Sequence, residues 1–136
     1  MYITAAQYAT ITGRNASEAT EVRRKRASLF LDARIGYYER NDDGYKLDLD
    51  GLTNYQKEIV QEWTAWMVVF LYDNNDLSPS AASVSLGRFS VTEHGQQGQV
   101  IPEQMSLTDH LLETSELINR SAVLKHRGVE YDELND

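Results

Sequence analysis

The chain has 136 residues, no cysteine and a formal net charge of −8 at pH 7. This length predicts a single domain. The lack of cysteine excludes a disulfide framework, a thiolate metal site and a cysteine nucleophile, and the charge disfavours a surface dedicated to free nucleic acid or anionic membranes. No apolar run has the length of a membrane span, and the N-terminus does not have the pattern of a secretory signal.

The first predicted helix runs from Ala5 to Thr12. Thr4 and Gln7 stand three residues apart, which is the spacing of a capping box. Gly13 is suited to the left-handed residue that follows a helix end. We therefore expect a short helix with defined caps at both ends.

A second helix is predicted from Ala16 to Tyr38, with Asn15 and Glu18 as its cap. Its first half is charged and its second half, "SLFLDARIGYY", is apolar on more than one face. The apolar residues at helical spacing predict one buried stripe. That stripe is Ala19, Val22, Phe30, Ala33 and Tyr37.

A basic run lies near the start of this helix, at Arg23, Arg24, Lys25 and Arg26. One interpretation is a contact with phosphate or with an acidic partner. The other is a solvated helix face, with Glu21 and Lys25 at the stabilising i, i+4 spacing. Four consecutive residues point all round a helix, which favours the solvated face.

The acidic stretch "ERNDDGYKLDLDG" is predicted to be a loop, with a short extended piece from Lys46 to Leu49. A calcium-binding loop needs oxygen ligands at alternate positions, a glycine at the sixth and a glutamate at the twelfth. Asp48 and Asp50 supply two such ligands, and the residues after them do not continue the pattern. No metal site is therefore expected.

The central helix is predicted from Thr53 to Asp73, and Thr53 with Gln56 forms a second capping box. Almost every residue of its second half is apolar, which is typical of the central helix of a bundle. Because its tryptophans fall on the apolar stripe, core packing is favoured over a ligand cage or base stacking. The residues expected to face inward are Tyr55, Ile59, Trp63, Trp66 and Phe70.

The stretch "SVSLGRFSVT", Ser83 to Thr92, has a β pattern that its neighbours lack. With Gly87 and Arg88 as a two-residue turn, a type II′ hairpin places every apolar side chain on one face. An isolated hairpin is marginal in water, so it must pack on its own bundle or on a partner. The polar flanks "NNDLSPSAA" and "EHGQQGQV" favour a partner. The predicted contact residues are Val84, Leu86, Gly87, Arg88, Phe89 and Val91.

A flexible linker is predicted over about residues 93–103, followed by a C-terminal helix and tail over 104–136. The helix is expected from Leu107 to Ile118, and its apolar residues are Leu107, Leu111, Leu112 and Ile118. The predicted fold is therefore mainly α: a small helical bundle, over about residues 4–76, around a long central helix with one short β-hairpin, over about residues 83–92.

No motif for catalysis is found. The chain has no phosphate-binding glycine loop, no paired-histidine spacing and no nucleophile elbow. His94, His110 and His126 are isolated and are expected at the surface. Catalytic, cofactor and metal sites are therefore not expected, and the protein is not expected to be an enzyme. An unrecognised enzyme would need a perturbed carboxylate in a deep pocket.

Most of the chain resembles the head–tail connector, or adaptor, proteins of tailed bacteriophages and prophages. The resemblance rests on the order of four segments rather than on one motif. The chain departs from the family pattern in its charged second helix and its short acidic tail. The four segments are "ITAAQYATITG", "WTAWMVVFLYDN", "SVSLGRFSVT" and "LTDHLLETSELINRSAVLKHRGV".

The resemblance implies a structural protein of the virion neck that is present in the host cytoplasm during assembly. Such adaptors form a ring of about twelve copies beneath the portal protein, extend the DNA channel and dock the next neck or tail-completion protein. Phage DNA then passes through the lumen without specific binding, and no membrane is involved. The alternative left by the residues themselves is a small nucleic-acid-binding regulator that uses Arg23 to Arg26.

Overall fold

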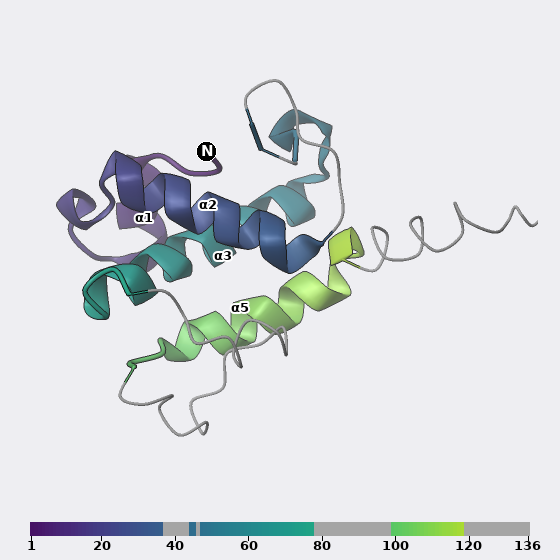
Figure 1. Cartoon of the computed structure of the whole chain (residues 1–136). Coiled ribbons are helices and arrows are strands. Elements are labelled where there is room, and N and C mark those ends of the chain that lie inside the picture. The colour runs from purple at the N-terminus through teal and green to yellow at the C-terminus, as the bar shows by residue number, and fades with distance from the viewer. Residues whose placement is uncertain (37–43, 46, 78–98, 119–136) are drawn as a thin grey trace, which may run out of the picture.

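The structure is a computed structural model that describes residues 1–36, 44–45, 47–77 and 99–118. This part of the chain is mainly helical, as predicted, and α1, α2 and α5 each pack on the long helix α3 (Figure 1). The predicted hairpin and most of the predicted linker lie outside the described residues. The elements are α1 (Ala5–Thr12), η1 (Ala16–Glu18), α2 (Glu21–Ile35), η2 (Leu49–Gly51), α3 (Asn54–Asp73) and α5 (Glu103–Thr114).

The first and central helices begin at the predicted caps. Thr4 and Gln7 form a capping box at α1, and Thr53 and Gln56 form one at α3. In each box the threonine side chain accepts a backbone N–H and the glutamine side chain accepts the N–H of the cap residue, which satisfies two donors that the helix leaves free. Gly13 ends α1 in the left-handed conformation, with φ 74°. Local sequence is sufficient to define these helix ends.

The prediction of one continuous helix from Ala16 to Tyr38 is wrong. A short 3₁₀ turn, η1, comes first, and α2 begins only at Glu21. Asn15 caps the turn through the backbone N–H of Ser17 rather than pairing with Glu18, and Thr20 caps α2 through the N–H of Arg23. Two hydrogen-bonding side chains five residues apart therefore start two elements where the periodicity predicted one.

The predicted apolar stripe is also wrong in phase along α2, although Ala19, which precedes α2, is buried as predicted and Tyr37 lies outside the described residues. Val22 is 67% exposed, Ala33 is exposed and Phe30 is half-buried. Two of the buried positions are polar, because Ser28 accepts a hydrogen bond from the backbone N–H of Tyr2 and Asp32 accepts one from the Tyr2 hydroxyl. An apolar-periodicity pattern cannot detect such positions. The buried face of α2 consists of Ala27, Ser28, Leu31, Asp32 and Ile35.

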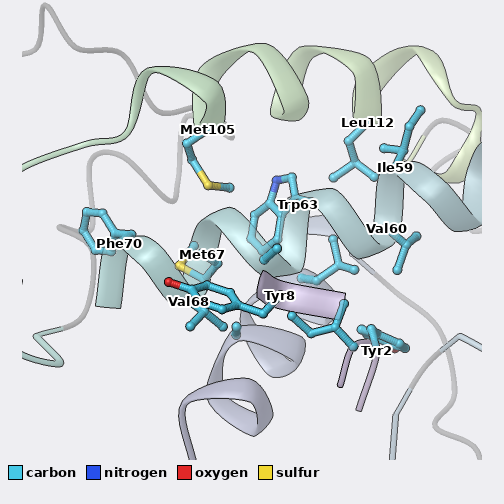
Figure 2. Close-up of a cluster of buried hydrophobic side chains, with 14 of the residues drawn as sticks. Tyr2, Tyr8, Ile59, Val60, Trp63, Met67, Val68, Phe70, Met105 and Leu112 are labelled. Atoms are coloured by element: carbon cyan, nitrogen blue, oxygen red, sulfur yellow. The ribbon is translucent and has the colours of Figure 1, made fainter. Parts of the chain in front are cut away.

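The core lies around α3 and joins residues from every part of the described chain (Figure 2). Trp63 and Phe70 are each 1% exposed and Ile59 is 2% exposed, which confirms three of the five predicted inward positions. The prediction for Tyr55 is wrong, since it is 52% exposed, and Trp66 is half-buried but still packs against the core. The largest fully buried side chains include Trp63, Tyr8, Phe70, Leu31, Met67, Leu71, Met105 and Leu112.

The last described helix differs from the prediction of Leu107 to Ile118. α5 begins at Glu103, directly after its N-cap residue Pro102, and ends at Thr114. Leu107 is 61% exposed and Leu111 is half-buried. The inward face of α5 instead includes a buried acidic residue, Asp109, which forms an ion pair with Arg34 of α2. That face consists of Met105, Thr108, Asp109 and Leu112.

In the acidic loop, the predicted extended piece from Lys46 to Leu49 is wrong at its end. Leu49, which was predicted to end an extended piece, starts the 3₁₀ turn η2, and the Asp48 side chain caps this turn by accepting the N–H of Asp50. The rest of that piece includes Lys46, which lies outside the described residues.

Candidate functional site

The described residues nearest the predicted contact region are those that flank it in sequence. Val84, Leu86, Gly87, Arg88, Phe89 and Val91 all lie outside the described residues. The flanking residues on both sides, up to Leu77 and from Gln99, are described. The candidate site is therefore built from these flanks and from the helices that hold them.

One buried side chain joins the two flanks. The Asn74 amide donates to the carbonyls of Phe70 and Val100, both at 2.8 Å, and its carbonyl oxygen accepts the Val100 N–H at 2.7 Å. These bonds are protected because Asn74 is only 7% exposed. The residues on either side of positions 78–98 are thus held together at the C-terminal end of α3.

The exit turn from α3 has an uncommon backbone conformation. Asn75 and Asp76 both have positive φ, at 56° and 64°. Asparagine and aspartate tolerate this left-handed region better than most residues. The Asp76 N–H donates to the Leu71 carbonyl at 2.6 Å and so closes the helix end. Because the chain turns here, the Asp76 carboxylate lies against the start of α2.

Arg23 binds that carboxylate in a bidentate pair. Its Nε and Nη2 lie 2.8 and 2.9 Å from the two oxygens of Asp76, and its Nη1 donates to the Glu18 carbonyl at 3.1 Å. The hydrogen bonds between Arg23 and Asp76 lower the pKa of Asp76 and raise the pKa of Arg23. Arg26 donates to the Asp76 backbone carbonyl at 2.9 Å. The start of α2 is therefore fastened to the end of α3.

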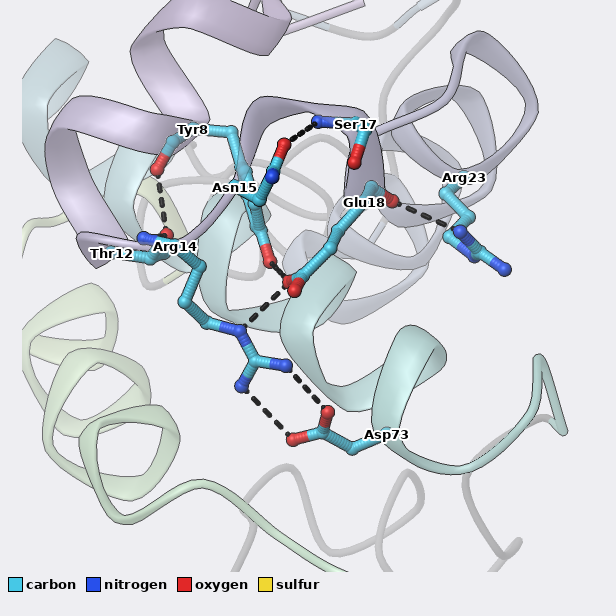
Figure 3. A network of polar contacts seen from close by, with 8 residues as sticks. All are labelled: Tyr8, Thr12, Arg14, Asn15, Ser17, Glu18, Arg23 and Asp73. Atoms are coloured by element: carbon cyan, nitrogen blue, oxygen red, sulfur yellow. Dashed lines mark hydrogen bonds and ion pairs between the residues drawn. The ribbon is translucent and has the colours of Figure 1, made fainter.

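Arg14 makes the matching contact from the end of α1. It forms a bidentate pair with Asp73 at 2.7 and 3.1 Å, and its Nε donates to Glu18 at 2.8 Å (Figure 3). Glu18 also accepts the Tyr8 hydroxyl at 2.6 Å. Burial raises the pKa of Tyr8, and the hydrogen bond to Glu18 raises it further. The hydrogen bonds to Asp73 raise the pKa of Arg14.

The two guanidinium groups share one aromatic ring. The carbon centres of the Arg14 and Arg23 guanidiniums lie 5.7 and 5.0 Å from the Tyr72 ring centroid, within the range of cation–π attraction. Tyr72 is itself 42% exposed, so one edge of this cluster is open to solvent. We call Arg14, Glu18, Arg23, Tyr72, Asp73 and Asp76 the base cluster.

Three of the four residues in the predicted basic run bind groups of their own chain, so the run is not simply a solvated face. Arg23 and Arg26 bind the exit turn, and Arg24 donates to the Ala19 carbonyl at 3.0 Å. Lys25 alone of the four is exposed, and in the described part of the chain no ion pair joins it to Glu21. The partners of the two exit-turn arginines are about fifty residues away in sequence, so no local pattern could have identified them.

A second polar cluster, which no sequence pattern predicted, lies inside the bundle. Asp109 of α5 is 1% exposed; it accepts the Trp63 Nε1–H at 2.8 Å and two bonds from Arg34 at 2.9 and 3.1 Å. Arg34 also pairs with Glu113 at 2.7 Å. The cluster joins α2, α3 and α5, and this arrangement positions helices rather than a reacting group.

The described residues show no arrangement for metal chemistry. No group of three histidine, cysteine, aspartate or glutamate side chains among them could hold a metal ion. His110 is exposed, as predicted, whereas His94 and His126 lie outside the described ranges. Within the same ranges, no helix is long and apolar enough to cross a membrane.

Comparison with known proteins adds no assignment. No protein-family model matches the chain, and neither a curated protein nor a solved structure shows significant similarity to it.

Proposed function

We propose that the protein is a structural head–tail connector of a tailed phage or prophage. In this function, copies form a ring beneath the portal protein, extend the DNA channel and dock the next neck or tail-completion protein. The segment Ser83 to Thr92 is the docking element, and the helical bundle is its support.

The observation that best supports this proposal is the tether between Asn74 and Val100. A contact element needs a rigid base, because ordering a loose segment at an interface opposes binding. Here both flanks of residues 78–98 start from one end of the bundle, and the base cluster braces that end with two bidentate ion pairs. Two of the four segments on which the resemblance to connectors rests, "ITAAQYATITG" and "WTAWMVVFLYDN", contain α1 and the end of α3.

The charge of the chain suits a DNA conduit. At a net charge of −8, copies arranged around a channel hold few free cations against a passing phosphate backbone. Each fixed cation in a lumen would add affinity through counterion release and slow passage. The nucleic-acid-binding alternative is not put forward, since three of the four cations on which it depends already bind groups of their own chain.

The test is co-purification with the portal protein encoded in the same genome. We expect the wild-type chain to be retained on portal rings and, once retained, to recruit the next neck protein. Phe89→Ser should leave the melting temperature of the isolated chain nearly unchanged but abolish that recruitment. The matched control is Leu107→Ser, which removes an apolar side chain that is 61% exposed on α5.

Two results would contradict the proposal. A wild-type chain that ignores portal rings at every salt concentration would remove the connector function. A Phe89→Ser variant that melts several degrees lower would instead assign Phe89 to the core of its own chain.

A further inference from the structure

One face of α2 points away from α3 and is largely exposed, although Leu29 within it packs partly against the core. Val22 is 67% exposed, Lys25 and Ala33 are exposed, and Leu29 is half-buried. Their spacing of three, four and four residues places them on one stripe. We call these four residues the α2 outer face. It is apolar with one cation, and Lys25 has no ion-pair partner among the described residues.

A second stripe, exposed at two positions and half-buried at two, lies on α3 and has the opposite charge; its Trp66 packs partly against the core. Tyr55 is 52% exposed, Glu58 is exposed, and Glu62 and Trp66 are half-buried. Their spacing is again three, four and four residues. We call these four residues the α3 outer face. In the described part of the chain neither glutamate has an ion-pair partner.

The α3 outer face is electrostatically unfavourable in a single copy. Partial burial raises the pKa of Glu62, and the neighbouring Glu58 carboxylate raises it further. A cation close to Glu62 would relieve both effects. An aromatic pair that flanks unpaired carboxylates is the composition of a binding surface, because tryptophan and tyrosine are enriched at the energetic centres of interfaces.

The two outer faces cannot meet within one copy. α2 packs on α3 through its opposite face, which carries Ala27, Leu31 and Ile35. The α3 residues that α2 covers are buried, so the outer face of α3 points elsewhere. Two different, complementary surfaces on one chain form a heterologous contact, which repeats from copy to copy and closes into a ring when the rotation allows.

We propose that the α2 outer face of one copy binds the α3 outer face of the next copy, with Lys25 beside Glu62 and aliphatic side chains covering Trp66. The closure of this head-to-tail contact into a ring rests on the proposed function, whereas the contact itself rests on exposure and charge. The contact is weak in isolation, because copies with a net charge of −8 repel one another.

A charge exchange tests the contact. Lys25→Glu and Glu62→Lys should each weaken self-association, measured by sedimentation over a range of concentrations, by roughly three- to tenfold. The double variant, which restores opposite charges, should recover to within about twofold of wild type. The matched control is Glu103→Lys, an exposed residue of α5 that undergoes the same change of charge.

Cross-linking tests the head-to-tail geometry. Because the chain has no cysteine, single cysteines can be introduced without a background. A mixture of the Lys25→Cys and Glu62→Cys variants should form a disulfide between the two variants, and neither variant alone should form one. A chain that carries both substitutions should form a ladder of oligomers. Leu107→Cys is the exposed control that should not cross-link to either.

The outcomes separate this contact from the proposed function. Equal association of wild type and both charge variants, or homodimers formed by a single-cysteine variant, would overturn the contact. A mixture that forms no disulfide at the highest soluble concentration would do the same. Retention on portal rings is measured separately, so the contact can fail while the connector function stands, and the reverse also holds.

Discussion

Two tryptophans three positions apart on α3 have different surroundings. Trp63 is 1% exposed, packs beneath α5 and donates its indole N–H to Asp109 (Figure 2). Trp66 is half-buried on the outer face. A helix turns by about 100° per residue, so a step of three residues moves a side chain from the centre of a stripe to its edge.

Trp63→Ala should therefore lower the free energy of unfolding by about 3–5 kcal/mol, through lost burial and the lost hydrogen bond to Asp109. Trp66→Ala should lower it by less, about 1–3 kcal/mol, because Trp66 is only partly buried and packs at the edge of the core. Chemical denaturation of both variants measures the difference. Equal losses would contradict the assignment of Trp66 to the outer face.

Glu62 is expected to destabilise the isolated chain near neutral pH. Its pKa is raised above the usual value of 4.5, so the folded state holds the proton more tightly than the unfolded state. The associated stability is complete below about pH 4.5 and is lost as the pH rises through the folded-state pKa. Glu62→Gln should add up to about 0.5 kcal/mol at pH 7 and nothing at pH 4. Chemical denaturation at pH 7 and at pH 4 measures the free energy of unfolding of the variant and of wild type. A lower free energy for the variant at pH 7 would show that Glu62 has a partner in its own chain.

At the scale of elements, the base cluster holds the start of α2 to the end of α3. The Arg23–Asp76 pair is bidentate, but the Asp76 side chain is 41% exposed, so solvent and salt weaken it. Of the three Asn74 bonds close to it, the one to the Phe70 carbonyl is buried and the two to Val100 are partly buried. A solvent-screened ionic contact and a better protected neutral contact therefore lie side by side at this end of α3.

Asp76→Asn should cost less than about 1 kcal/mol at pH 7, and the cost should shrink in high salt. The pKa of Asp76 is lowered from 3.8, so its contribution is present above that pH and is lost as the pH falls through the folded-state value. Melting curves from pH 7 to pH 2 should show the variant converging on wild type in acid. If the difference in melting temperature between the two proteins stays constant with pH, the charge of the Asp76 carboxylate does not cause the difference in stability.

The junction of α2, α3 and α5 depends on a buried ion pair. Asp109→Ala should cost about 3 kcal/mol or more, because it leaves the Arg34 side chain, 12% exposed, without its main counter-ion. Glu113→Ala is the matched control and should cost less than about 1 kcal/mol, since Glu113 is 46% exposed. A double-mutant cycle of Arg34→Met and Asp109→Leu should show coupling above about 1 kcal/mol; additive losses would mean that the pair does not act as a unit.

At the scale of the whole molecule, charge opposes assembly and the outer faces favour it. At low micromolar concentration and low salt, we expect repulsion to dominate and the isolated chain to sediment as a monomer or a weak oligomer. Moderate salt should first strengthen association by screening the net charge. Sedimentation velocity at several salt concentrations tests this. A tight dimer under the low-salt conditions would contradict it.

The sequence by itself determined the features that depend on neighbouring residues. Thr4 with Gln7, Thr53 with Gln56, and Gly13 defined helix ends correctly, because capping bonds span only three residues. The apolar second half of α3 identified the central helix, because a helix hydrophobic on all sides must be buried. The mainly helical class followed from these local signals.

Only the tertiary structure decided which faces turn inward on α2 and α5. Asp32 and Asp109 are buried because Tyr2, Arg34 and Trp63 reach them from distant parts of the chain, and hydrogen bonding offsets the cost of burying a carboxylate. Arg23 likewise turns toward Asp76, fifty-three positions away. A periodicity pattern treats such residues as solvent-facing, so it placed Ala33 and Leu107 inside when both are exposed.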